Sequence, residues 1–184
     1  MANFDLSYQK MLKLEFNSPR NALHKNKGET GYTFMGIYQT AHPNWRGWAI
    51  VEAYLQNFGN MQLASERLYQ NAEIKELTAQ FYKKEFWDKA KLDSVIPYEQ
   101  AHLIFCFGVN VGLKTAIKKA QQIVGVDDDG IVGKITIKAL NAYSPLKFET
   151  EYKRAFIDYY TRLATSNPKY RVFLTGWLNR VKNT

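Results

Sequence analysis

The sequence predicts a mostly α-helical protein with one short β-hairpin. Apolar residues recur at the three- and four-residue spacing of amphipathic helices through most of the 184 residues. Most of the five prolines fall between these stretches, where a proline ends a helix. Strand-like alternation is almost absent, and its best example, within residues 31–38, is the predicted hairpin.

The predicted elements follow the turn residues of the chain. A first helix covers about residues 3–16, with Asn3 or Asp5 available to cap it. A loop rich in glycine and polar residues runs to about Gly36, and a tryptophan-rich turn follows at 42–48. Helical spacing then returns in segments at about 48–57, 61–70, 73–89, 98–109, 116–124, 134–141, 149–165 and 169–180.

Glycines and aromatic residues mark the second half of the chain. Gly108 and Gly112 interrupt the helical pattern before it resumes. In the last segment, Tyr170, Phe173 and Trp177 lie about one turn apart. We expect these rings to form one stripe that packs the C-terminal helix on the core.

Composition and length indicate a globular protein of one domain with at most a small appendage. The 46% hydrophobic and 15% aromatic content is too high for a disordered chain, and a lone Cys106 excludes a disulfide scaffold. No apolar run approaches the roughly 20 residues of a membrane span. The first residues lack the pattern of a signal peptide, so we expect a cytoplasmic protein unless another factor releases it.

The chain is basic, with 25 Lys and Arg against 17 Asp and Glu and a formal net charge of +8. Such a surface attracts polyanions: nucleic acid, anionic lipid or acidic cell-wall polymers. The basic residues are spread out and match no zinc-finger or basic-zipper pattern, so we expect no nucleic-acid partner. A basic surface without a dedicated partner and a helical nucleic-acid binder remain alternatives.

Glu15 is the residue whose position points most clearly to chemistry. In a helix over 3–16, Phe4, Tyr8, Met11 and Leu12 share one apolar face, and Glu15 projects from its middle. Desolvation there would raise the pKa of the carboxyl, as a general acid requires. The alternative is a glutamate at a fraying helix end that turns out to water.

The other candidate motifs favour structural interpretations. Asp127–Gly130 resembles a calcium loop, but Ile131 stands where the next ligand would be needed, so a polar turn before a helix is expected. The three histidines are far apart and lack metal-ligand spacing. Cys106 lies in an apolar run and is expected to be a buried, inert thiol. We therefore expect no metal and no cofactor.

Five motifs in order resemble the muramidases of glycoside hydrolase family 108, with a C-terminal peptidoglycan-binding-type segment. They are Gly31–Ile37, Tyr82–Asp88, Phe105–Gly112, Asp129–Thr136 and Asn167–Arg180. The resemblance covers nearly the whole chain and implies a lysozyme-like helical fold. It further implies a catalytic segment at 1–95 and a peptidoglycan-binding-type segment at 96–184, packed into the same globule.

The resemblance assigns Glu15 as the general acid that cleaves the β-1,4 link between N-acetylmuramic acid and N-acetylglucosamine. The family's glutamate normally stands in Glu-Gly-Gly-Tyr, whereas here Glu15 is followed by Phe16-Asn17-Ser18. Glu29, just before the Gly31–Ile37 motif, is the nominee for a second carboxylate. It is equally a candidate for a solvated loop residue.

Four more residues are interpreted as substrate contacts. Thr33 could hold a water that attacks from the opposite face, giving inversion. Tyr38, Trp87 and Asn110 are candidate sugar contacts, with packing as the alternative role.

The resemblance also implies partners and a place of action. We expect a monomeric phage or prophage endolysin whose partner is peptidoglycan, with no nucleic acid and no stable membrane insertion. It would leave the host cytoplasm through a holin-type lesion and act on the cell wall. A wall-binding or secretion-assisting protein with little turnover, and a lytic transglycosylase, are the alternative functions.

Overall fold

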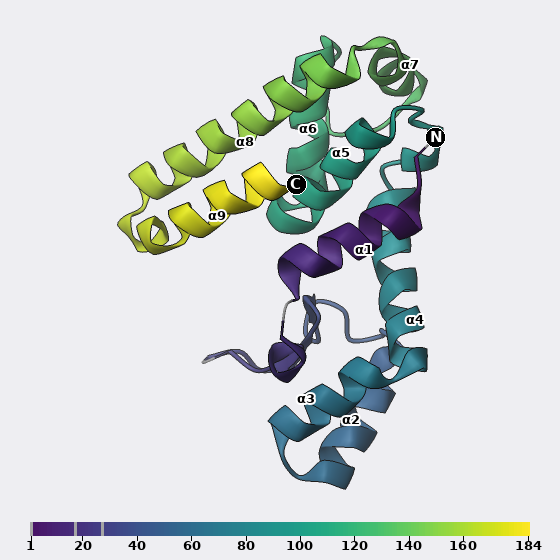
Figure 1. Cartoon of the computed structure of the whole chain (residues 1–184), viewed down its shortest axis with the longest axis vertical. Coiled ribbons are helices and arrows are strands. Elements are labelled where there is room, and N and C mark those ends of the chain that lie inside the picture. Colours follow the sequence, from purple (N-terminus) through teal and green to yellow (C-terminus); the bar gives the residue numbers. More distant parts are fainter. Residues whose placement is uncertain (1, 17, 27) are drawn as a thin grey trace. The chain divides into compact units, whose positions relative to one another are not determined.

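Figure 1 shows the chain, a computed structural model that describes residues 2–16, 18–26 and 28–184. It divides into two compact units. The first unit comprises Met1–Leu14 and Lys84–Thr184, and the second comprises Glu15–Lys83. The sequence-based boundary between residues 95 and 96 stays a prediction.

The prediction of a mostly α-helical fold is confirmed. The α-helices are α1 (Phe4–Glu15), α2 (Gly47–Phe58), α3 (Met61–Gln70), α4 (Ala72–Tyr82), α5 (Tyr98–Val111), α6 (Leu113–Val124), α7 (Lys134–Ala142), α8 (Pro145–Ser166) and α9 (Arg171–Asn183). The strands are β1 (Leu23–His24), β2 (Thr33–Phe34) and β3 (Ile37–Tyr38), and short helical segments are η1 (Pro19–Asn21), η2 (Lys83–Asp88), η3 (Leu92–Ser94) and η4 (Pro168–Tyr170). None of the described helices is long and apolar enough to cross a membrane.

Two helices differ most in extent from their predictions. The helix expected to reach residue 89 ends as α4 at Tyr82, and the π-helical segment η2 continues it. The helix expected from residue 149 begins at Pro145. Ser144 caps that end with its hydroxyl, and a proline fits the first turn because its missing N–H would have no partner there.

In the second unit, the strands form an antiparallel sheet in the order β1-β2-β3. Thr33 pairs with Tyr38, which confirms the predicted hairpin. Its two turn residues, Met35 and Gly36, both have positive φ, at 44° and 80°, as the tightest hairpin turns require. Strand β1 was not expected, because a strand of two residues is too short to show alternation.

Tyr82 of α4 holds the hairpin turn. Its hydroxyl donates a 2.7 Å hydrogen bond to the carbonyl of Met35. A Cβ at Gly36 would stand 2.6 Å from that hydroxyl oxygen and 3.4 Å from Cζ of Phe16. Glycine is therefore required at position 36 both because a side chain would not fit and because the backbone φ is positive. These contacts join α4, the hairpin turn and the segment after α1 within one unit.

In the first unit, the core is built around α5. Every residue from Gln100 to Gly108 is buried, as expected of a helix covered on all sides. Phe107 stacks on Phe156 of α8 with ring centroids 3.8 Å apart. Phe105 meets the ring of Trp87 edge-on at 5.7 Å.

The aromatic stripe of α9 packs only in part. Trp177 stacks on Tyr160 of α8 at 5.0 Å. Phe173 is 52% exposed and Tyr170 is 37% exposed, so the prediction that the whole stripe docks on the core is wrong for these two rings. The reason is that α9 lies along α8 as the second arm of a helical hairpin (Figure 1), and only the face toward α8 is covered.

Gln121 of α6 anchors the turn before α7. Its side chain is 1% exposed, and its Oε1 accepts the N–H of Gly130 at 2.8 Å. The two hydrogens of its Nε2 are donated to three oxygens: Asp129 Oδ1 at 2.9 Å, the Ile131 carbonyl at 3.0 Å and Thr136 Oγ1 at 3.3 Å. The turn is thus built from direct hydrogen bonds.

The same network bears on the calcium-loop alternative. The pKa of Asp129 is lowered mainly by its hydrogen bond from the Ile131 N–H and next by the one from the Gln121 amide. This carboxylate is therefore already bound by N–H donors. In the part of the chain that the structure describes, no group of acidic, histidine or cysteine side chains could hold a metal ion. Both observations support the interpretation of this segment as a turn.

Replacing Gln121 by alanine should lower the free energy of unfolding by about 2–4 kcal/mol, because it leaves buried polar groups without partners and opens a cavity. Urea unfolding measures this loss. Gln122→Ala, at the exposed neighbouring position, is the control and should change stability by no more than about 0.5 kcal/mol. Equal effects of the two substitutions would contradict the anchoring role.

His102 of α5 is a buried histidine in an apolar and basic environment. Its ring stacks on Tyr98 at 5.5 Å, and one ring nitrogen lies 3.6 Å from the sulfur of Cys106. Burial, followed by the charges of Lys10 and Lys153, lowers the pKa of His102 to about 4. The imidazole is therefore neutral at neutral pH, and Cys106 is buried beside it.

This lowered pKa predicts a loss of stability in acid. As the pH falls from about 6.5 to 4, the unfolded chain binds a proton that the folded chain excludes, and the free energy of unfolding drops by about 3 kcal/mol. His102→Gln should remove this part of the pH dependence. Urea unfolding of both proteins at pH 7 and pH 4 tests it, and an equal acid loss in both would contradict it.

Candidate active site

Glu15 is the last residue of α1. Phe4, Tyr8 and Met11 of this helix are buried, as the helical spacing predicts. The Glu15 side chain is half-buried. It is therefore less buried than a core carboxylate and less exposed than a glutamate at a solvated helix end. Glu15 also opens the second compact unit, where the ring of the next residue, Phe16, lies against the hairpin turn.

Glu29 lies in the loop that leads into the hairpin. Its Oε1 accepts a 3.1 Å hydrogen bond from the side-chain amide of Asn26. Its Oε2 is buried and makes no hydrogen bond with any described residue. A fully solvated loop glutamate would expose both oxygens to water, so this environment favours the site interpretation of Glu29 over the solvated one.

Tyr38 connects Glu29 with the hairpin. The pKa of Tyr38 is lowered mainly by a hydrogen bond with the Thr40 hydroxyl and next by one with the Thr30 hydroxyl. The negative charge of Glu29 raises it. The two threonine hydroxyls are themselves 3.1 Å apart. The carboxylate and the phenol therefore belong to one polar cluster at the end of the sheet.

Thr33 of β2 is directly opposite Tyr38 of β3. Residues directly opposite in an antiparallel pair point to the same face, so both side chains belong to one side of the hairpin. Thr33 is 8% exposed. The structure thus brings Glu29, Thr33 and Tyr38 together in the second unit, which also contains Glu15.

Trp87 and Asn110 belong to the first unit. Trp87 is fully buried, packs edge-on against Phe4 and Phe105, and donates its indole N–H to Asp93 at 2.6 Å. These contacts support the packing role rather than the sugar contact. Asn110 is half-buried, and its side-chain amide donates to the Cys106 carbonyl at 2.9 Å.

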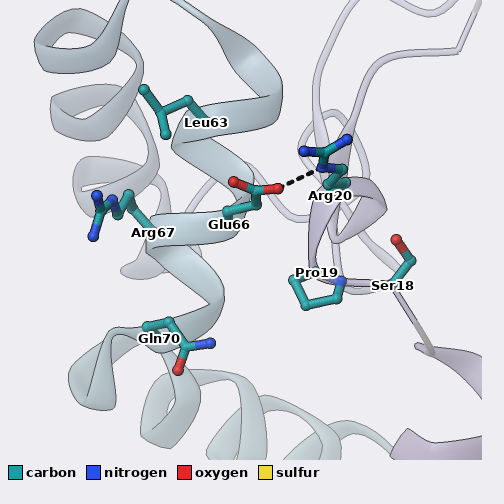
Figure 2. A pocket seen from close by; sticks show the side chains of 7 residues that line it. All are labelled: Ser18, Pro19, Arg20, Leu63, Glu66, Arg67 and Gln70. Carbon is teal, nitrogen blue, oxygen red and sulfur yellow. Dashed lines mark hydrogen bonds and ion pairs between the residues drawn. The ribbon is translucent and has the colours of Figure 1, made fainter.

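A cavity of about 490 Å³ lies within the second unit (Figure 2). One wall is the segment that follows α1, and the other is a single face of α3 whose residues recur at helical spacing. The lining residues are Ser18, Pro19, Arg20, Leu63, Glu66, Arg67 and Gln70. Nε of Arg20 forms an ion pair with Glu66 across the cavity at 2.5 Å.

Sequence reasoning did not select these cavity residues. Arg20 and Glu66 are 46 positions apart, and polar residues on the outer face of a helix are the ordinary condition of a surface helix. No spacing or motif joins them, and only the folded chain brings them together.

Comparisons with known proteins match two consecutive parts of the chain. Residues 22–112 match the family described as Glycosyl hydrolase 108, and residues 115–182 match the family described as Predicted Peptidoglycan domain. The first match includes Glu29, Thr33 and Tyr38, and it begins after Glu15. No curated protein matches the chain.

Among solved structures, the chain is similar to that of SagA from Brucella abortus. The TM-score is 0.64 and the sequence identity is 19%, over 97% of this chain and 89% of that one. At this identity the similarity shows the fold.

Proposed function

We propose that this chain, which matches the Glycosyl hydrolase 108 family over residues 22–112 and the Predicted Peptidoglycan domain family over residues 115–182, is an N-acetylmuramidase. Its substrate bond is the β-1,4 link between N-acetylmuramic acid and N-acetylglucosamine. The family matches support the coarser function, a peptidoglycan hydrolase. The observation that carries the finer one is that one unit contains both Glu15, whose neighbour Phe16 lies at the hairpin turn, and Glu29, whose charge acts on Tyr38 of the hairpin.

In this proposal, Glu15 is the general acid. It protonates the oxygen of the leaving sugar as the other sugar gains oxocarbenium character. Its half-buried side chain supports this role, because limited contact with water keeps a carboxyl group protonated more readily than full exposure does.

Glu29 is the second carboxylate of the proposal. Its sheltered Oε2 makes no hydrogen bond to a described residue, so this oxygen keeps its capacity to accept one. That partner would be an attacking water in an inverting reaction or the oxocarbenium carbon in a retaining one. Thr33 and Tyr38, on one face of the hairpin, would hold the water or the sugar beside it.

The setting of the reaction is part of the proposal. The basic chain, with net charge +8, would be retained on an anionic cell wall. We propose a monomeric endolysin of a phage or prophage that leaves the cytoplasm through a holin-type lesion. Asn110 remains a proposed sugar contact.

Glu15→Gln should abolish clearing of a peptidoglycan suspension, because the amide has no proton to donate at neutral pH. Its melting temperature should equal or exceed that of the wild type, since glutamine is neutral, like the protonated acid, and keeps the shape of the side chain. The control is Glu52→Gln, at an exposed position of α2 in the same unit. An active Glu15→Gln protein would remove Glu15 from the mechanism.

Glu29→Gln should lower kcat by about 100-fold or more, the usual contribution of a positioned acid–base group. The same turbidity assay measures it, with Glu52→Gln again as control. A rate within twofold of the wild type would show that Glu29 is a loop residue without a catalytic role.

The products separate hydrolysis from the transglycosylase alternative. Mass spectrometry of the released muropeptides should show a reducing N-acetylmuramic acid end. An anhydro end would identify a lytic transglycosylase, and no released product would favour a wall-binding protein without turnover.

A further inference from the structure

The cavity beside α3 carries more positive than negative charge. Of the described residues that line it, Arg20 and Arg67 carry guanidinium groups and Glu66 carries the carboxylate. Its volume of about 490 Å³ lies in the range of small-ligand sites. Such a cavity favours an anionic ligand group over a neutral or cationic one.

Arg20 is oriented to bind a carboxylate. Its Nε is occupied by Glu66, and Figure 2 shows one terminal nitrogen on the side of Glu66 and the other on the far side. The terminal N–H groups of an arginine form a planar fork that binds a carboxylate through two parallel hydrogen bonds. Glu66 thus holds the guanidinium in place and leaves the fork available.

The walls of the cavity are fixed to each other. Ser65 of α3 is fully buried, and its hydroxyl donates to the carbonyl of Pro19 at 2.6 Å and accepts the N–H of Leu23 at 2.9 Å. These bonds join the segment that carries Arg20 to the helix that carries Glu66. A ligand group therefore meets donors that are already in position.

The cavity is close to the proposed acid along the chain. Ser18, at its edge, is three residues after Glu15, so their Cα atoms are separated by about 11 Å at most. Both residues belong to the second unit. A substrate bound at Glu15 therefore has its neighbouring groups within reach of the cavity.

We propose that this cavity binds the carboxylate groups of the stem peptide that N-acetylmuramic acid carries in peptidoglycan. The inference rests on the proposed function, because it takes peptidoglycan as the substrate. In a muramic acid unit that carries its peptide, the lactyl carboxyl is an amide, so the sugars present amides and hydroxyls. The peptide then supplies the carboxylates that match the Arg20 fork. Arg20, assisted by Arg67, thereby selects muramic acid units that still carry their peptide.

Binding measurements test the proposal without turnover. The probe is the soluble disaccharide of N-acetylglucosamine and N-acetylmuramic acid with its stem peptide, which lacks the bond to be cleaved. The comparison compound is the same disaccharide without the peptide and with its lactyl carboxyl capped as an amide, because a free lactyl carboxylate would present the same group to Arg20. In isothermal titration, the wild type should bind the peptide-bearing compound about tenfold more tightly, and Arg20→Gln should reduce this preference to about threefold or less.

The matched control is Arg46→Gln, which removes the same charge from an exposed position of the same unit outside the cavity. It should keep the tenfold preference. Thermal melting verifies that the variants fold, and Arg67→Gln, expected to lose about threefold, is the second variant if Arg20→Gln does not fold. A wild type without preference, a preference that survives both cavity substitutions, or an equal loss in Arg46→Gln would overturn the proposal.

Failure of the proposed function has a different signature. A wild-type protein that releases no sugar from peptidoglycan fails as a muramidase, whereas its preference for the peptide-bearing disaccharide is measured independently. Conversely, an active enzyme with no such preference keeps the proposed function and rejects the stem-peptide site.

Discussion

The close approach of Tyr82 to the Met35–Gly36 turn is the constraint on which the candidate active site depends. The phenol donates to the Met35 carbonyl, and at 2.6 Å there is no space for a side chain on Gly36. The same turn is in contact with Phe16. One hydrogen bond and one glycine therefore fix the hairpin turn against Tyr82 and Phe16 within the second unit, which also contains Glu15.

The two proposed carboxylates are positioned by different means. Glu15 is placed by a helix whose apolar face is buried, so its position follows from packing along α1. Glu29 is placed by a loop, through the Asn26 amide and the polar cluster around Tyr38. Glu15 thus ends a helix with a buried apolar face, whereas Glu29 lies in a loop among polar side chains, and unlike environments allow two carboxylates to take different roles.

Hydrogen bonds between distant parts of the chain also organise the remainder. Gln121 satisfies the turn that the Asp129–Thr136 motif forms, so the motif's aspartate and threonine act in folding. In the second unit, Ser65 and the Arg20–Glu66 ion pair join the segment after α1 to α3. An exposed ion pair stabilises little by itself, and its consequence here is the orientation of a guanidinium beside a cavity.

The sequence by itself determined the helical class, most helix positions, the hairpin and the burial of one face of α1, because periodicity, caps and turn residues act over a few positions along the chain. It also nominated Glu29 without separating a site residue from a solvated one. Only the tertiary structure decided that Oε2 of Glu29 is sheltered, that Phe173 is left exposed, and that Arg20 meets Glu66 across 46 positions. The physical reason is that a local pattern records which face of an element is apolar, whereas the partner of a polar side chain depends on which distant element packs against it.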